Sequence, residues 1–140
     1  MRKRSQSREL ALQILYQADI KQIPVDEFIS DFWKHLMDEQ PLPNAVREYA
    51  QTLACKTFEN LKKIDEVVEQ YTENWEMDRM AYVDRNILRL STYELLYQQD
   101  VPMKVVLNEA VELAKRFGED DSSKFVNGIL DKIAKTVCRK

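Results

Sequence analysis

Glycine and proline are scarce in this chain, which has two glycines and four prolines among its 140 residues. An all-β fold needs many tight turns, and such turns rely on both residue types. The scarcity therefore argues against an all-β fold, and no stretch alternates apolar and polar residues long enough to predict a strand. Two glycines also cannot build a glycine-rich phosphate-binding loop.

Cysteine and histidine are equally rare. The two cysteines, Cys55 and Cys138, lie far apart and form no CxxC motif, so we interpret them as a buried thiol and a tail thiol in a reducing compartment. The single histidine, His35, has no cysteine or carboxylate at metal-ligand spacing and is expected at the surface or the edge of the core. With no nucleophile motif either, we expect no catalytic activity, no metal site and no cofactor.

Long hydrophobic runs are missing as well. No apolar stretch approaches the length of a membrane span or of a signal-peptide core. A chain of this length can bury roughly 68% of its unfolded surface in one core, and its 44% hydrophobic and 32% charged residues are typical of a globular protein. We therefore expect a single cytoplasmic domain over residues 1–140.

Acidic residues are absent from the first eight positions, although the whole chain has a net charge of −3. The basic residues of this segment are Arg2, Lys3, Arg4 and Arg8. Residues 132–140 are likewise basic without an acid, so both ends are basic and the body is acidic. This asymmetry favours a polyanion bound at the termini. We expect residues 1–8 to form a basic, flexible N-terminus.

The clearest helical pattern lies in residues 101–133, which predict two helices joined by a short acidic turn. Pro102 is tolerated in a first helical turn, because its missing N–H has no intrahelical partner. The first apolar stripe consists of Val106, Ala110, Leu113, Ala114 and Phe117. The second consists of Val126, Ile129, Leu130, Ile133 and Val137, with Phe125 at its edge.

Both glycines fall in this region. Gly118 follows the first stripe, where glycine takes the left-handed conformation after a helix without a Cβ penalty. The next helix can be capped by Asp120, Asp121 or Ser122. Gly128 lies inside that helix, where glycine costs about 1 kcal/mol relative to alanine. We therefore expect another helix or a ligand to approach Gly128 closely.

The rest of the chain also has helical periodicity. Amphipathic helices are predicted over residues 5–20, 25–38 and about 45–72. Residues 73–80 interrupt the pattern, and Trp75 and Met77 are expected to tuck into the core from a short turn. The following stretch, 81–100, is apolar on several faces, which predicts a helix central to a bundle. The fold class is therefore all-α, with about six or seven helices in one domain.

Two arginines in the central helix have two possible roles. Arg85 and Arg89 are one turn apart and project from the same helix face. They either form ion pairs with acids such as Asp84 or Glu94, or they form part of a functional basic surface. The residues alone leave both interpretations open.

Three segments resemble the NusB family of bacterial transcription antitermination factors. They are SRELALQILY, VDRNILRLSTYELLY and VPMKVVLNEAVELAKRFGEDDSSKFVNGILDKI. The resemblance covers nearly the whole chain, although residues 21–75 match the family only in helical pattern. It implies an all-helical domain of two subbundles.

The resemblance also implies a non-catalytic RNA-binding adaptor. Members of the family bind the boxA element of nascent RNA together with NusE, a small-subunit ribosomal protein. The pair loads an antitermination complex, with RNA polymerase and other Nus factors, mainly during ribosomal RNA synthesis. A second interpretation is a homodimeric protein-interaction module that leaves RNA contact to its partner, which the acidic body and the short arginine run favour.

The family's RNA-binding positions fall on nine residues of this chain. They are Arg2, Lys3, Arg4, Arg8, Arg85, Arg89, Asp121, Lys124 and Phe125. Arginine and lysine pair with phosphates, and an aromatic ring at a helix start can stack on an unpaired base. For Phe125, plain core packing is the alternative.

The resemblance further implies a contact with NusE. The residues at this contact would be Tyr16, Ile20 and Asp84. Ordinary packing between helices is the alternative for these three. The RNA sequence preference, the oligomeric state and the order of partner binding do not follow from the sequence.

Overall fold

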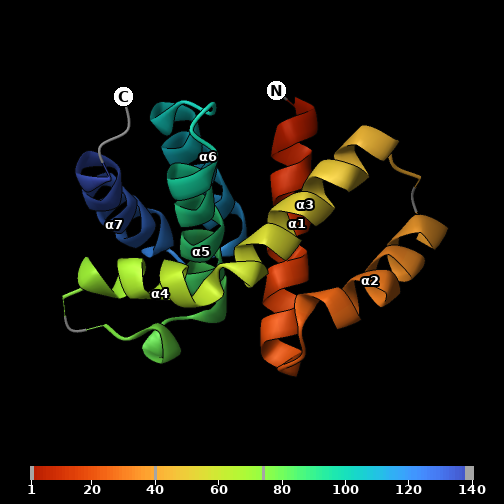
Figure 1. The fold of residues 1–140 in the computed structure, drawn as a ribbon, viewed down its shortest axis with the longest axis horizontal. Coiled ribbons are helices and arrows are strands. Elements are labelled where there is room, and N and C mark those ends of the chain that lie inside the picture. Colours follow the sequence, from red (N-terminus) through yellow and green to blue (C-terminus); the bar gives the residue numbers. More distant parts are fainter. Residues whose placement is uncertain (1, 40, 74, 138–140) are drawn as a thin grey trace. The chain divides into compact units, whose positions relative to one another are not determined.

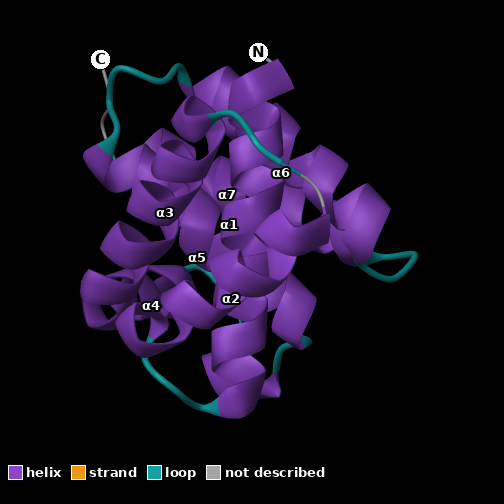
Figure 2. Cartoon of the chain, turned by 90° about the vertical axis from the view of Figure 1, so that its right-hand side faces the viewer, coloured by secondary structure: helices purple, strands orange, loops and turns teal. Residues whose placement is uncertain are grey.

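The computed structural model describes residues 2–39, 41–73 and 75–137. This part of the chain forms seven α-helices and one short 3-10 helix, and it contains no strand (Figure 2). The all-α class and the expected number of helices are confirmed. None of the described helices is long and apolar enough to cross a membrane. The chain divides into two compact units, Met1–Glu59 and Asn60–Lys140.

The first unit consists of three helices, α1 (Arg2–Lys21), α2 (Val25–Glu39) and α3 (Asn44–Glu59). Helix α1 packs against both α2 and α3, and α3 crosses it in Figure 1. The buried apolar side chains of this unit include Ala11, Ile14, Leu15, Phe32, Val46, Ala50 and Leu53. The Ser7 hydroxyl donates a 2.8 Å hydrogen bond to the Val46 carbonyl, which fixes the N-terminal part of α1 against α3.

Helix α1 begins earlier than the sequence pattern suggests. The periodicity predicts a helix over 5–20 that follows a flexible segment, whereas the structure is helical from Arg2 onward. Arg2, Lys3 and Arg4 are the first residues of α1, and no acidic residue lies in its first turn. These basic residues are therefore at the positive end of the helix dipole, where cations are unfavourable.

The expected long helix over 45–72 is wrong. The structure ends α3 at Glu59 and begins α4 (Leu61–Gln70) after Asn60. Asn60 has φ −106° and ψ 18°, outside the helical region. Asparagine favours such breaks because its side chain competes for local backbone hydrogen bonds. Each of the two helices then has its own buried face.

The second unit consists of α4, the 3-10 helix η1 (Met77–Arg79), α5 (Tyr82–Tyr97), α6 (Met103–Phe117) and α7 (Ser122–Thr136). Helix α5 packs against α4, α6 and α7, and α6 packs against α7. Every residue of α5 from Arg85 to Leu95 is buried. The expected central position of this helix in its bundle is confirmed, and Figure 1 shows α6 and α7 alongside it.

Three prolines start helices in the same way. Pro24, Pro43 and Pro102 each stand directly before the first residue of a helix. The carbonyl of each one accepts hydrogen bonds from the N–H groups three and four residues further on. Proline fits there because its missing N–H would have no intrahelical partner. Pro102 therefore precedes α6 instead of lying within its first turn.

Both expectations for the glycines need correction. Gly118 has φ −96° and ψ −171°, which is extended and not left-handed. It is required there for space, because a Cβ would lie 2.5 Å from Cβ and Oγ of Ser122. At Gly128 a Cβ would meet no described atom within 4 Å. The expected close helix crossing is therefore wrong, while approach by a ligand stays a prediction.

Candidate nucleic-acid interface

The N-terminal cations of α1 occupy different environments. Lys3 and Arg4 are exposed, whereas Arg8 is buried with 3% of its surface exposed. Arg4 Nη1 donates a 3.3 Å hydrogen bond to the Tyr49 hydroxyl of α3, and its guanidinium carbon lies 4.4 Å from the Tyr49 ring centroid. The side chain of Arg2 lies outside the described residues. Lys3 and Arg4 are thus the described cations of this segment that a polyanion can reach.

Arg89 is held inside the second unit. Its Nε and Nη2 each donate a 2.9 Å hydrogen bond to the Asp65 carboxylate of α4, and Nη1 lies 3.3 Å from Asn86 Oδ1. Of the two interpretations left open by the sequence, ion pairing describes Arg89, and Asp65 is a partner that the sequence interpretation did not name. This bidentate pair joins α5 to α4.

Arg85 is also buried. Its Nη1 donates a 3.1 Å hydrogen bond to the Met77 carbonyl of η1, and its guanidinium carbon lies 4.3 Å from the Tyr82 ring centroid. Both arginines therefore have contacts within the unit. Direct RNA contact by Arg85 or Arg89 stays a prediction.

The first turn of α7 brings three of the expected residues together. Asp121 and Lys124 are exposed, and Phe125 is half-buried. Because they are spaced at i, i+3 and i+4, they lie on one side of the helix start. Asp121 directly precedes α7 but makes no side-chain cap hydrogen bond. Instead, the Ser122 hydroxyl accepts a 2.9 Å hydrogen bond from the Glu119 N–H, which closes the turn and leaves the Asp121 carboxylate at the surface.

Trp75 is a residue of this site that the sequence interpretation missed. It was expected in the core, yet 47% of its surface is exposed, so that expectation is wrong; Met77 is buried as expected. The Trp75 and Phe125 ring centroids lie 6.1 Å apart with an interplanar angle of 74°, an edge-to-face contact. The available signal was a tryptophan in the polar segment ENWEMDRM.

The residues expected at the protein contact lie on two helices. Tyr16 and Ile20 are one turn apart on α1, where Tyr16 is half-buried and Ile20 is 47% exposed. Asp84 lies in the first turn of α5, where the helix dipole favours an acid. One of its carboxylate oxygens, Oδ1, is buried and has no hydrogen-bond partner among the described residues. A buried acceptor without a donor costs free energy, while the rest of the half-buried Asp84 side chain stays accessible.

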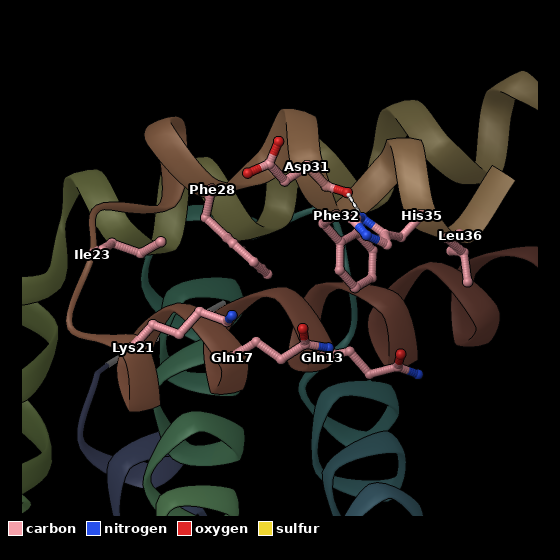
Figure 3. A pocket seen from close by; sticks show the side chains of 9 residues that line it. All are labelled: Gln13, Gln17, Lys21, Ile23, Phe28, Asp31, Phe32, His35 and Leu36. Carbon is pink, nitrogen blue, oxygen red and sulfur yellow. Dashed lines mark hydrogen bonds between the residues drawn. The ribbon is translucent and has the colours of Figure 1, made fainter. Parts of the chain in front are cut away.

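A cavity of about 400 Å³ lies between α1 and α2 of the first unit (Figure 3). Gln13, Gln17 and Lys21 line it from α1, and Phe28, Asp31, Phe32, His35 and Leu36 line it from α2, with Ile23 at the connection. His35 is exposed, which confirms its expected surface position. Its Nδ1 donates a 2.9 Å hydrogen bond to the Asp31 carbonyl. The lining combines glutamine, charged and apolar side chains.

Cys55 is a free, half-buried thiol, less buried than expected. Burial raises the pKa of the Cys55 thiol, and the nearby Glu59 and Asp26 carboxylates raise it further. The thiol is therefore protonated at neutral pH and is a weak nucleophile. Among residues 2–39, 41–73 and 75–137, no group of three His, Cys, Asp or Glu side chains could hold a metal ion. Cys138 lies outside the described residues.

The fold is thus that of an all-helical protein, whose first unit has exposed cations on α1 and whose second unit has the Trp75–Phe125 pair at the start of α7. The NusB family model matches residues 5–135. The chain therefore belongs to the NusB family, as its sequence resemblance predicts.

Individual family members are similar over nearly their whole length. The transcription antitermination protein NusB of Anaeromyxobacter dehalogenans is 46% identical over 132 residues, which cover 94% of this chain and 90% of that protein. The structure of T. maritima NusB has a TM-score of 0.85 at 36% identity and covers 95% of this chain and 91% of its own. A chain from the crystal structure of antitermination factors NusB and NusE in complex with dsRNA has a TM-score of 0.83 at 31% identity, with coverages of 96% and 98%.

Proposed function

We propose that this chain is a non-catalytic RNA-binding adaptor that binds boxA-type single-stranded RNA together with NusE in transcription antitermination, mainly of ribosomal RNA operons. The observation that carries the proposal is the exposed first turn of α7, where Lys124 and Phe125 offer a cation and an aromatic ring side by side. The similarity to a chain crystallised with NusE and dsRNA supports binding of RNA and NusE. Since transcription takes place in the bacterial cytoplasm, the adaptor acts there.

Phosphates and bases use different groups of the protein in this proposal. Lys3 and Arg4 pair with RNA phosphates, and the positive end of α1 adds to the attraction. Lys124 pairs with a phosphate, and the aromatic pair of Trp75 and Phe125 beside it meets an unpaired base. The Asp121 carboxylate accepts hydrogen bonds from base amino groups, because a carboxylate without a proton is an acceptor only.

The buried arginines contribute to RNA binding only indirectly, by holding the folded structure that carries the RNA contacts. In the described conformation Arg89 holds α4 against α5 and Arg85 holds the η1 backbone. Arg8 lies within the folded first unit. We assign the direct phosphate contacts to Lys3, Arg4 and Lys124.

NusE binds through Tyr16, Ile20 and Asp84 in this proposal. Ile20 offers an exposed apolar side chain, and the half-buried Asp84 carboxylate offers a hydrogen-bond acceptor to a NusE donor. The protein and NusE then deliver the RNA to the transcription elongation complex with RNA polymerase and other Nus factors. Because the protein contributes recognition of RNA and NusE, it catalyses no reaction itself.

The first experiment is a salt series of RNA binding. A fluorescent single-stranded boxA-like RNA is titrated with the purified chain, alone and with NusE. We expect weak, salt-sensitive binding that tightens with NusE. The double variant Lys3→Ala/Arg4→Ala should reduce the slope of log K against log salt by roughly 0.7 for each lost phosphate contact.

A matched control removes the same charge elsewhere. Lys62 and Lys63 are both exposed on α4, and their replacement by alanine should leave the slope nearly unchanged. An equal effect of both double variants would contradict a specific role of the N-terminus. A stable dimer in light scattering that ignores RNA, with or without NusE, would favour the homodimeric interaction module.

A further inference from the structure

The most exposed aromatic surface at the α7 site belongs to Trp75. Trp75 is 47% exposed, whereas Phe125 is half-buried. In their edge-to-face contact the rings lie 6.1 Å apart at 74°, so each fixes the orientation of the other. Stacking needs an accessible ring face, and indole offers a larger one than phenyl. We propose that Trp75 is the residue on which an unpaired RNA base stacks, with Phe125 as the positioning residue that holds the indole.

Hydrogen bonds hold the Trp75 carbonyl and the backbone of Met77. The Thr72 hydroxyl lies 2.6 Å from the Trp75 carbonyl oxygen, to which it donates a hydrogen bond. Two residues further on, the Met77 N–H donates a 2.9 Å hydrogen bond to the Glu69 carboxylate, and the Met77 carbonyl accepts one from Arg85. A ring on a fixed backbone loses less conformational entropy on binding than one on a mobile loop. The exposed indole is thus preorganised for a ligand.

The charges near Trp75 indicate which part of RNA binds there. Glu73 and Glu76 flank Trp75 in the chain, and both are exposed. Carboxylates repel phosphate, so a phosphate contact at the indole is unfavourable. The face of a nucleobase carries no net charge, and base amino groups can donate to these carboxylates. The environment therefore suits an unpaired base, while Lys124 on α7 provides the cation for its phosphate.

This inference rests on the proposed RNA-binding function and adds the stacking residue. It gives buried Arg85 a positioning role near the same site, because Arg85 holds the Met77 carbonyl two residues beyond Trp75. It also predicts a preference for unpaired bases. In a double helix the faces of the bases are already stacked and are closed to the indole.

Intrinsic fluorescence of the full chain with NusE tests the inference. The probe is a single-stranded boxA-like RNA, and the reference is a duplex of the same sequence. The second tryptophan, Trp33, is buried and donates to Gln51, so RNA-dependent quenching reports on Trp75. We expect quenching with the single strand that disappears in Trp75→Phe.

Affinity measurements distinguish the stacking role of Trp75 from the positioning role of Phe125. Trp75→Ala should weaken single-strand binding by about 5- to 150-fold, the range for loss of one stacked base, at an unchanged salt slope and an unchanged duplex affinity. Trp75→Phe should retain most of the affinity, since it keeps an aromatic face. Adding Phe125→Leu to Trp75→Ala should reduce the RNA affinity little further. Phe125 acts by holding the indole, which Trp75→Ala has already removed. Tyr97→Ala removes an equally exposed aromatic side chain of the same unit and serves as the control.

The outcomes are distinguishable. If the unmodified chain binds the single strand without quenching and Trp75→Ala binds equally well, the inference is overturned and the proposed function stands. A larger loss in Phe125→Leu than in Trp75→Ala would make Phe125 the stacking residue and overturn the inference as well. If the chain binds no RNA with or without NusE, the proposed function fails and the inference fails with it.

Discussion

Arg89 keeps a buried guanidinium group because Asp65 accepts two hydrogen bonds from it. A buried charge is costly unless a partner compensates it, and removal of one partner leaves the other uncompensated. Asp65 retains more solvent contact than Arg89, so the penalty falls mainly on the arginine. This side chain explains why spacing alone could not decide between ion pairing and RNA binding: the partner comes from another helix, 24 residues away in sequence.

Substitution of Arg89 tests its structural role. Arg89→Ala should lower the free energy of unfolding by about 3 kcal/mol, near the lower end for buried pairs, because Asp65 stays partly hydrated. Arg89→Lys should recover part of the loss, since lysine keeps the charge but not the bidentate geometry. Urea denaturation of the variants measures both values. A fully stable Arg89→Ala with a reduced RNA salt slope would instead show that Arg89 contacts phosphate directly.

At the scale of helices, the sequence predicted the type and order of the elements better than it predicted where each helix begins and ends. Helical periodicity located α2, α5, α6 and α7. It could not locate the break at Asn60, because the apolar residues continue through it at helical spacing. It also could not place Trp75, since exposure of a tryptophan depends on contacts with α7. The expected Asp121, Lys124 and Phe125 did fall at one helix start.

Gly118, which precedes α7, and Gly128, which lies within it, should respond oppositely to alanine. Gly118→Ala should destabilise the fold by about 1–3 kcal/mol, because its Cβ overlaps Ser122 and that side chain closes the turn. Gly128→Ala should stabilise it by about 0.5–1 kcal/mol, since the helix gains propensity and the space is open. Thermal unfolding with calorimetry measures both effects.

RNA binding by the same variant tests the remaining expectation at Gly128. A ligand that approaches the helix backbone there would collide with the added methyl group. Lower RNA affinity in a more stable Gly128→Ala protein would therefore support ligand approach. Equal RNA affinity would contradict the approach of a ligand at Gly128.

For the whole molecule, charge is distributed unevenly. Four of the 21 basic residues lie in the first eight positions, and none of the 24 acidic residues do. An acidic body repels RNA at long range, so few phosphate contacts have to carry the attraction. This balance predicts that the chain alone binds RNA weakly. A second protein that adds contacts to the same RNA then has a large effect on affinity.

Separate variants can divide the two binding reactions. Ile20→Ala and Asp84→Ala remove an exposed apolar side chain and a half-buried carboxylate, and each should weaken NusE binding by about 1–3 kcal/mol. Neither should change RNA affinity without NusE, because neither supplies a phosphate or base contact. Calorimetric titrations of NusE and of RNA, each with and without the other, measure these effects. Tyr97→Ala again controls for loss of an exposed side chain.

The same titrations measure the coupling between RNA and NusE. If NusE tightens RNA binding by a given factor, RNA must tighten NusE binding by that factor. We expect about 5- to 150-fold for the unmodified chain. In Ile20→Ala the factor should persist once NusE is saturating, because the variant lowers occupancy and not the contacts that NusE makes with RNA. A factor of one in the unmodified chain would mean that NusE and RNA bind independently, and the adaptor would then have no cooperative role.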